Sequence, residues 1–423
     1  VLRGSGGSSQ VEVNAFGHVI RELSRQEGLA GEEVALTIDL ELQKMVNRRF
    51  KDESGAAVVM DIHNGDILAM VSTPTFDPNA FNRGLSEKEW RALTTDPKTP
   101  LINKAINGQF APGSTFKMIV LLAALEKGVI RPENKIHCSG EMQLGNATFH
   151  CWKKDGHGWM DSFNALMQSC DVYFYEVARR VGIDNIARMA GKFGLGTELG
   201  MDTPGERAGL IPTKAWKRAV IGQPWVLGET LVAGIGQGFI TTTPMQLATM
   251  TARMVNGGKI VQPHLARDVV LRDKLAARVP AETETIDVDP RHLKSVTDAM
   301  ALVTAAPAGT AHAARIMTPG MSMGGKTGTA QVRRITQRER DGGVIKNKDL
   351  PWRYRDHALF VGYGPVEAPR YAIAVVVEHG GGGSAVAAPI ARDVMTQTLK
   401  RDPARLAPGA NVAGLRAPGS QGG

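Results

Sequence analysis

An apolar run from Met118 to Leu125 constrains the fold more than any other segment of the chain. It predicts a helix that is apolar nearly all round, and such a helix is normally buried in the core of a large domain. Lys117 directly precedes this run, so the helix is expected to carry a lysine into the core. Because burial disfavours the ammonium form, a lysine there can act as a neutral base. Ser114 lies one helical turn away and would gain a partner that accepts its proton.

The same segment also has a purely structural interpretation. Pro112 and Gly113 would end the preceding loop, and Ser114 would cap the helix through its hydroxyl. The amine of Lys117 would then reach out to solvent rather than into the core. Because a four-residue S-x-x-K pattern recurs by chance, it does not decide the function alone. Two further motifs have to be weighed with it.

The second motif, Ser169-Cys170-Asp171, separates two predicted helices. Its structural interpretation is simple, since Asp171 would be a natural N-cap for the helix over residues 171–182. Ser169 would then be an incidental residue of the turn. The functional interpretation needs a partner for these two polar side chains elsewhere in the chain.

The third motif, Lys326-Thr327-Gly328-Thr329, falls in a predicted strand. The two-residue period of a strand puts Lys326, Gly328 and Ala330 on one face. A strand that runs against a ligand benefits from the missing side chain at Gly328, and a backbone N–H stays available beside it. The structural alternative is a glycine at a strand edge next to a solvated lysine.

The predicted strands lie at both ends of the chain and the predicted helices lie between them. Strands are expected at residues 34–39, 55–61, 66–71, 326–332, 357–364 and 371–379, with Asn64-Gly65 as a hairpin turn. Helices are expected at 40–50 behind an Asp39 cap, and at 114–127, 171–182, 244–256 and 389–400, with helical periodicity dominating from 85 to 201. This order indicates the α+β class: one antiparallel sheet built from both chain ends, with a helical lobe inserted.

The same pattern divides the chain into three parts, of which only the second is a compact domain. Residues 1–30, glycine- and serine-rich around a short strand-like stretch at 11–13, resemble the tail of a preceding module. Residues 31–402 form the compact domain. Residues 403–423 offer no core face and are expected to be disordered. No run approaches the ~18 apolar residues that are needed to cross a bilayer.

The net charge of +8 and the pI near 9.4 favour an anionic partner, such as an acidic membrane surface or cell-wall polymer. Aromatic residues make up only 5% of the chain, without a basic patch between them, which argues against nucleic acid. Residues 333–356 form a long basic segment between two predicted strands. Such a segment is usually a solvated face. Alternatively it is a lid or a track for anionic glycan, with Trp352 and Tyr354 as stacking surfaces.

All three cysteines, Cys138, Cys151 and Cys170, fall between the first and second motifs, with His157 among them. This clustering indicates a Cys₃His zinc site, although gaps of twelve, five and twelve residues are not those of a zinc finger. Two other interpretations stay open: a Cys138 to Cys151 disulfide with Cys170 buried, or three unpaired core cysteines. His137 and Asp155 are reserve ligands. A zinc ion held by Cys170 would fasten the Ser169 turn to the preceding loop.

The order of the three motifs, S-x-x-K, S-x-D and K-T-G-T, is that of penicillin-binding proteins and serine β-lactamases. Four longer segments, AVVMDIHNGDILAMVSTPTFDPNAF, NKAINGQFAPGSTFK, GIGQGFITTTPMQLA and HALFVGYGP, resemble class B penicillin-binding proteins. Within that class, the last three of these segments are most similar to the cell-elongation branch, penicillin-binding protein 2. The resemblance implies a transpeptidase domain over 31–402, with the fold of penicillin-binding proteins and serine β-lactamases, and a pedestal or linker remnant over 1–30.

The resemblance also implies roles for the motif residues. Ser114 would be the acylated nucleophile and Lys117 its proton acceptor. Ser169 would relay a proton to the leaving amine, while Lys326 would set the electrostatics of the site and orient Ser169. The N–H groups of Ser114 and Thr329 would form the oxyanion hole.

The remaining motif residues would hold the substrate. Thr327 would pack beneath the site beside Gly328, and the hydroxyl of Thr329 would meet the substrate carboxylate. Asp171 stands where many relatives carry asparagine, so an acceptor or structural role is expected of it rather than that of an amide-like donor.

The activity that this resemblance implies is D,D-transpeptidation. Ser114 would attack the D-Ala-D-Ala end of a peptidoglycan stem peptide, and β-lactam antibiotics would acylate the same serine, with no cofactor required for catalysis. Expected partners are a glycosyltransferase of the SEDS family and rod-shape scaffold proteins. The expected location is the periplasmic face of the bacterial inner membrane, with an anchoring N-terminal helix absent from this chain.

Two other functions are open. A β-lactamase or D,D-carboxypeptidase would have to activate water on the acyl-enzyme, and no clear candidate residue for that step is apparent. The three intact motifs argue against a non-catalytic scaffold, and a β-lactam sensor would need a coupled signalling segment, which these residues do not show.

Overall fold

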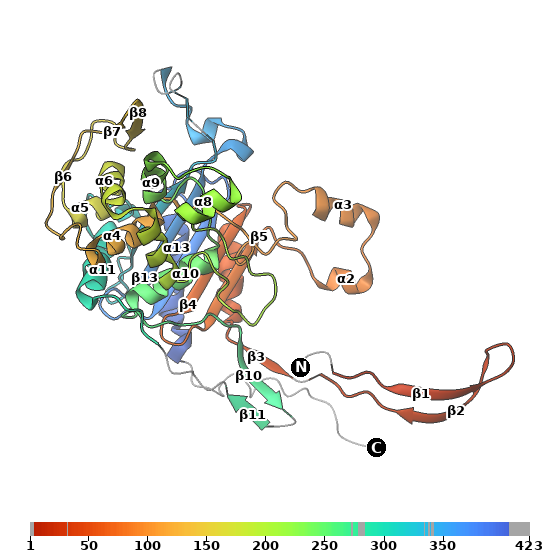
Figure 1. Cartoon of the computed structure of the whole chain (residues 1–423). Coiled ribbons are helices and arrows are strands. Elements are labelled where there is room, and N and C mark those ends of the chain that lie inside the picture. The colour runs from red at the N-terminus through yellow and green to blue at the C-terminus, as the bar shows by residue number, and fades with distance from the viewer. Residues whose placement is uncertain are drawn as a thin grey trace.

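The computed structural model describes residues 4–31, 33–271, 274–277, 284–333, 335, 336, 339 and 342–405. Its centre is a five-stranded antiparallel sheet of order β12-β13-β14-β4-β5 (Figure 1). The strands are β4 (Gly55–Asp61), β5 (Ile67–Thr73), β12 (Gly324–Ala330), β13 (His357–Gly364) and β14 (Tyr371–Val377). Strand β14 joins the two ends of the chain, since its Val377 pairs with Gly55 of β4. The predicted sheet from both chain ends, and with it the α+β class, is confirmed.

Both faces of the sheet are covered, and so its strands are apolar on both sides. Along β4, Val58 belongs to the core on one face and Val59 to the core on the other. Helices α1 (Leu40–Phe50) and α13 (Ala387–Arg401) pack on one face, and α10 (Pro244–Val255) packs on the other. As predicted, Asp39 caps α1, because its carboxylate accepts a hydrogen bond from the Leu42 N–H at 3.0 Å.

The inserted lobe lies on the α10 side of the sheet. Its helices are α4 (Lys117–Glu126), α5 (Ser162–Met167), α6 (Asp171–Val181), α7 (Ile183–Lys192), α8 (Lys214–Val220), α9 (Leu227–Gly234) and α11 (Pro290–Ala305). Every residue from Lys117 to Leu125 is buried, as the apolar run predicts. The core of the lobe therefore forms around α4.

The expectation that helices dominate the whole stretch from 85 to 201 is wrong in one part. Residues 136–160 form two small two-stranded sheets, β6 (Ile136–Cys138) with β9 (Gly158–Met160) and the hairpin of β7 (Glu141–Leu144) with β8 (Ala147–His150). These strands are three or four residues long and largely unburied, so they carry no strong apolar alternation for a sequence pattern to detect.

Two segments project from the body in Figure 1. One is the hairpin of β1 (Ser8–Val13) and β2 (Val19–Gln26), none of whose residues is buried. The other carries α2 (Asn79–Arg83) and α3 (Glu87–Thr95), which also bury no residue. The hairpin is longer than the short strand predicted at 11–13, and its origin as a pedestal remnant stays a prediction.

The predicted strand at 34–39 is shorter than expected. It survives only as β3 (Val34–Leu36), and it pairs with β10 (Ala266–Leu271) outside the central sheet. Strand β10 also pairs with β11 (Lys274–Ala277). Strand β3 is therefore separate from the central sheet, in which the sequence pattern places residues 34–39.

Short 3₁₀ turns occupy parts of the chain for which no helix or strand is predicted. Within the basic segment they span Asn347–Asp349 and Trp352–Tyr354, and another covers His312–Ala314. Of the tail predicted to be disordered, Pro403–Arg405 forms a 3₁₀ turn, and 406–423 lie outside the described residues. Within the described part of the chain, no helix is long and apolar enough to span a bilayer.

Candidate active site

Ser114 lies in a 3₁₀ turn, Gly113–Phe116, that leads directly into α4. The prediction that Ser114 caps the helix is therefore wrong, because the serine is already inside the helical turn and Phe116 occupies the cap position. The turn begins at Gly113 with a φ of 53°, and a Cβ there would lie 2.7 Å from the Thr329 carbonyl oxygen. Ser114 itself is half-buried, and its hydroxyl makes no hydrogen bond to any described residue. The nucleophile candidate is thus accessible and uncommitted.

Lys117 is fully buried, as the sequence predicts, but its amine faces the second motif. Its Nζ donates to the carbonyl oxygen of Ser169 at 2.9 Å and to the Ser169 hydroxyl at 3.3 Å. It also forms an ion pair with Asp171, at 2.7 Å from Oδ1. Burial is therefore not the only feature of its surroundings, since a carboxylate lies against the amine. The contact predicted between Lys117 and Ser114 is not made in this state.

The second motif forms a tight turn between α5 and α6. Ser169 has a φ of 57°, which is unusual for a residue with a Cβ, and Cys170 occupies the N-cap position. The prediction of Asp171 as N-cap is therefore wrong by one residue, because Asp171 is already the first residue of α6. Its carboxylate accepts from Lys117 through Oδ1 and from the Trp152 N–H through Oδ2, at 2.9 Å. Asp171 thus acts only as an acceptor in this structure.

The third motif occupies β12, the edge strand next to the Ser114 turn. Lys326 is fully buried and its amine donates to the Thr327 carbonyl oxygen at 3.1 Å. Burial, followed by repulsion from the Lys117 cation, holds the pKa of Lys326 well below its usual value, and attraction to Asp171 partly opposes this. The predicted contact of Lys326 with Ser169 is absent. Thr327 does pack beneath the strand, where its hydroxyl meets that of Thr310 at 2.8 Å.

Gly328 allows the close approach of another segment of the chain rather than of a ligand. A Cβ at this position would lie 3.0 Å from both the Pro112 carbonyl oxygen and Cγ2 of Thr115. Both atoms belong to the segment that carries Ser114, so the missing side chain lets the first and third motifs touch. The prediction that Gly328 leaves room against β12 was right, but the room is filled by the chain itself.

Thr329 presents its backbone to the free edge of the sheet. Its carbonyl oxygen accepts from Nε2 of Gln237 at 3.0 Å rather than from a strand. Because the N–H and C=O of one strand residue point to the same side, the Thr329 N–H faces the same edge, beside Gly113. The Thr329 hydroxyl accepts from the Gly383 N–H at 3.3 Å and keeps its own hydrogen to donate. Gln237 lies in the GIGQGFITTTPMQLA segment, but no sequence pattern predicts a role for it.

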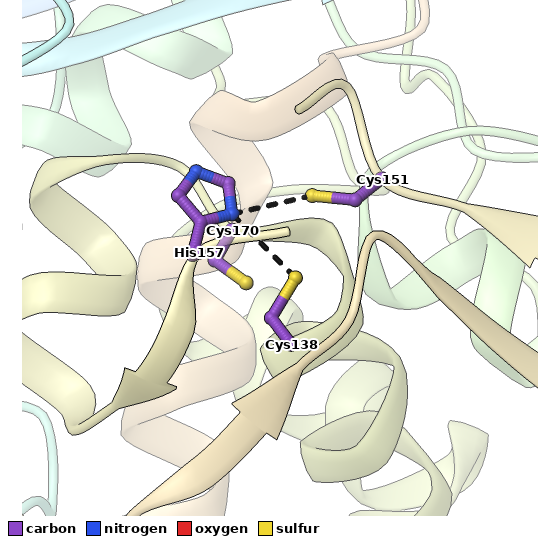
Figure 2. Close-up of side chains that lie close together, drawn as sticks. All are labelled: Cys138, Cys151, His157 and Cys170. Carbon is purple, nitrogen blue, oxygen red and sulfur yellow. Dashed lines mark hydrogen bonds between the residues drawn. The ribbon is translucent and has the colours of Figure 1, made fainter. Parts of the chain in front are cut away.

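The four predicted metal ligands converge at a second site (Figure 2). The Sγ atoms of Cys138 and Cys151 lie 3.6 and 3.5 Å from Nδ1 of His157, and Cys170 completes a group whose ligand atoms all lie within 4.8 Å of one another. Cys138 ends β6, Cys151 follows β8, His157 precedes β9, and Cys170 is the N-cap of α6. The reserve ligands His137 and Asp155 are outside this group.

The thiols are buried and none is in a disulfide. The hydrogen bond with the Cys170 thiol lowers the pKa of Cys151, and the same contact raises the pKa of Cys170. Nε2 of His157 is buried without a partner among the described residues. The three cysteines and His157 thus form a compact, largely buried group of potential metal ligands.

Comparison with known proteins agrees with the three-motif geometry. Residues 55–396 match the family described as the penicillin binding protein transpeptidase domain. The chain belongs to this family.

Among curated proteins, the chain is 38% identical over 389 residues to the peptidoglycan D,D-transpeptidase MrdA of Escherichia coli strain K12, covering 91% of this chain and 61% of that protein. The chain therefore spans less than two thirds of the length of this relative. The fold is also close to penicillin-binding protein 2 of Pseudomonas aeruginosa, solved with WCK 5153, at a TM-score of 0.78 and 37% identity, covering 88% of this chain and 80% of that one. A complex of penicillin-binding protein 2 with MreC from Helicobacter pylori has a TM-score of 0.80 at 30% identity, over 93% and 69% of the two chains.

Proposed function

We propose that this chain is a serine-type peptidoglycan D,D-transpeptidase that cross-links stem peptides during cell elongation and is acylated by β-lactams. The observation that carries the proposal is the convergence of three distant motifs on one buried lysine. Lys117 bonds to Ser169 and Asp171 of the second motif, and its charge acts on Lys326 of the third. The membership of the transpeptidase family supports the same reading.

The first step needs a group that takes the proton of Ser114. Two buried lysines face a single carboxylate, that of Asp171, so both amines cannot be protonated without an uncompensated buried charge. Burial holds the pKa of Lys326 well below its usual value, which disfavours a second cation at this site. We therefore propose that Lys117 is neutral before it takes the proton of Ser114, and that the ammonium it becomes is then paired with Asp171.

Bond changes follow from these positions. Oγ of Ser114 attacks the carbonyl carbon of the penultimate D-alanine, and the peptide bond to the terminal D-alanine breaks. The leaving amine takes up the proton through Ser169, whose hydroxyl lies 3.3 Å from Lys117 Nζ. The amine of a second stem peptide then attacks the acyl carbonyl carbon, the ester bond to Oγ of Ser114 breaks, and the proton that the amine loses returns to Oγ as the cross-linking amide forms.

The oxyanion of each tetrahedral intermediate needs two N–H donors. We assign the N–H groups of Ser114 and Thr329, which lie on the turn and on the sheet edge that Gly328 allows to meet. Loss of one such donor typically costs about 10²- to 10³-fold in rate. Thr327, Gly328 and Thr329 would form the surface along which the substrate backbone lies, with the free hydrogen of the Thr329 hydroxyl directed to the substrate carboxylate.

The test is intact mass after incubation with a labelled penicillin. We expect one adduct per chain that is lost in Ser114→Ala and kept in Ser295→Ala, a serine on α11 whose hydroxyl only bonds within its own helix. An adduct that persists for hours supports the transpeptidase. Rapid release of hydrolysed penicillin would instead favour a β-lactamase or carboxypeptidase, and no adduct at all would favour a scaffold.

We further propose the cellular setting that the resemblance implies. The domain would act at the periplasmic face of the bacterial inner membrane, held there by an N-terminal helix outside these residues. Its partners would be a SEDS-family glycosyltransferase and a rod-shape scaffold protein, the latter supported by the MreC complex of the Helicobacter pylori relative. Pull-down of these two proteins by the full-length protein, with the hairpin at 8–26 intact and deleted, would test the assignment.

We infer a structural zinc ion at Cys138, Cys151, His157 and Cys170. Zinc bonds of about 2.3 Å to sulfur and 2.0–2.1 Å to nitrogen in a tetrahedron set ligand atoms about 3.5 Å apart. The observed Sγ to Nδ1 distances of 3.6 and 3.5 Å fit this spacing. Such an ion would join β6 and the segment between β8 and β9 to the turn that carries Ser169.

Metal analysis of protein purified without added zinc tests this inference. We expect about one zinc per chain and its loss in Cys138→Ser. Absence of zinc together with fewer than three free thiols would point to a disulfide, and absence of zinc with three free thiols would point to core cysteines.

A further inference from the structure

Trp152 touches the catalytic turn at three points although most of its side chain is in solvent. Its backbone N–H donates to Oδ2 of Asp171 at 2.9 Å. Its indole Nε1 donates to the carbonyl oxygens of Gln168 and Ser169, both at 3.1 Å. Yet 59% of the residue is exposed, so burial of the ring does not explain its position. The hydrogen bonds are the feature that distinguishes it.

Lys117 and Trp152 bind the same two acceptor groups. The Ser169 carbonyl oxygen accepts from Lys117 Nζ at 2.9 Å as well as from the indole N–H. The Asp171 carboxylate accepts from Lys117 through one oxygen and from the Trp152 N–H through the other. The position of the Lys117 amine therefore depends on the Ser169 carbonyl and the Asp171 carboxylate, to which Trp152 also donates hydrogen bonds.

The turn needs such support because of its own conformation. Ser169 has a positive φ of 57°, which a residue with a Cβ adopts only when its surroundings impose it. Without the indole N–H, rotation of the Gln168 and Ser169 peptide units would be opposed by one donor fewer at each carbonyl. Such a rotation would move the two Ser169 atoms that accept hydrogen bonds from Lys117, the carbonyl oxygen and the hydroxyl oxygen.

Trp152 also lies beside the cysteine group. It directly follows Cys151, and its ring packs edge to face on His157, with 5.2 Å between the centroids. Trp152 thus connects the segment between β8 and β9 to the turn that carries Ser169. Cys170, the other link between the cysteine group and this turn, belongs to the turn itself.

We propose that Trp152 is a positioning residue for acylation. Its indole N–H fixes the carbonyl of Ser169, its backbone N–H fixes the carboxylate of Asp171, and together they set where the amine of Lys117 lies. This inference rests on the proposed function, in which Ser114 is acylated. Trp152 does not itself contact the reacting atoms.

The experiment compares variants that differ in one N–H. Trp152→Phe removes the indole donor and keeps both a ring and the backbone N–H. Benzothienylalanine at position 152 keeps the size of indole and replaces the N–H by sulfur. Trp159→Phe is the matched control, because Trp159 is 67% exposed on the neighbouring strand β9, packs on His137 and makes no hydrogen bond to the turn.

The measurement is the acylation rate at increasing concentrations of a fluorescent penicillin, which separates the dissociation constant from the first-order acylation constant. We expect the acylation constant to fall about tenfold in both position-152 variants, with the dissociation constant within about twofold of wild type. The pH profile of the acylation constant should also shift, because the surroundings of Lys117 change. Trp159→Phe should match wild type in all three quantities.

The outcomes separate this inference from the proposed function. If the wild-type chain is not acylated, the proposed function fails. If it is acylated and both position-152 variants keep its acylation constant and pH profile, Trp152 is not a positioning residue. A loss in Trp152→Phe that is absent with benzothienylalanine would assign the effect to ring packing and would also overturn the inference. The sulfur analogue keeps the test decisive should the phenylalanine variant fold poorly.

Discussion

The lysine site and the cysteine group are both buried polar assemblies, but the chain holds them in different ways. Lys117 and Lys326 stand on α4 and β12, elements that are buried along almost their whole length. Cys138, Cys151 and His157 stand at or beside the ends of strands of three or four residues that bury little, and only Cys170 belongs to a buried helix, as the N-cap of α6. Apolar packing therefore fixes the lysine site, whereas side-chain chemistry has to fix the cysteine group. The two meet in the turn from Gln168 to Asp171.

The largest expected effect distinguishes Lys117, a buried lysine that takes part in the proposed reaction, from Lys104, a buried lysine that does not. Lys117→Ala should lower the acylation rate by about 10³-fold, because it removes the proton acceptor. Lys104→Ala is the control: Lys104 is only 1% exposed, and its amine donates to the carbonyls of Thr73, Lys98 and Thr99. That variant should be less stable in thermal unfolding, yet its folded fraction should be acylated within about threefold of the wild-type rate. Equal losses of acylation in both variants would mean that Lys117 is merely structural.

The second expected effect concerns the single carboxylate that faces two lysines. Asp171→Asn keeps an acceptor for Lys117 but removes the negative charge. Since that charge raises the pKa of Lys326, its loss should lower the pKa of Lys326 further. We expect the acid limb of the pH profile for acylation to move to lower pH, by roughly one unit. An unchanged profile would show that Asp171 does not control the protonation of the lysine pair.

The third expected effect concerns the cysteine group. Cys138→Ser, or removal of metal with a chelator, should lower the unfolding temperature by roughly 5–10 °C, because a structural metal contributes directly to folding free energy. Hydrogen exchange should rise over residues 136–160 and stay low in α4. A rise of equal size in α4 would contradict the division between packing and side-chain chemistry.

The smallest expected effect uses a histidine next to the third motif. His357 pairs with Ala330 at the end of β12, and burial, followed by the nearby His379, lowers the pKa of His357 to about 4. The unfolded chain would titrate near the usual value of about 6.5, so between these values only the unfolded state binds the proton. Stability should therefore fall as the pH falls from about 6.5 to about 4, by up to ~3 kcal/mol.

His357→Asn serves as the comparison, because asparagine keeps a neutral acceptor where Nδ1 accepts from the His379 N–H. Its unfolding temperature, followed between pH 4 and 7.5, should vary less than that of the wild type. A wild-type curve as flat as that of the variant would mean that His357 does not stay neutral in the folded state.

Local patterns were enough for most of the elements, whereas the roles of the motif residues come from the resemblance to penicillin-binding proteins. The Asn64-Gly65 hairpin, the Asp39 cap and the buried helix after Lys117 all follow from turn chemistry, capping and apolar periodicity. The four residues of the cysteine group were found because cysteine is rare and clustered in this chain. The short strands at 136–160 are not predicted, since strands of three or four largely unburied residues leave no period to detect.

The amino-acid sequence by itself determined which groups the site has: a serine and a lysine one turn apart, a second serine with an aspartate, a lysine in a strand, and three cysteines with a histidine. Only the tertiary structure decided how they are paired. It joined Lys117 to Asp171 rather than to Ser114, used Gly328 to admit the Ser114 turn, and brought Gln237 and Trp152 to carbonyls far away in sequence. The physical reason is that hydrogen bonds and ion pairs depend on distances of a few ångströms between segments, and those distances are set by packing of the whole core rather than by any local pattern.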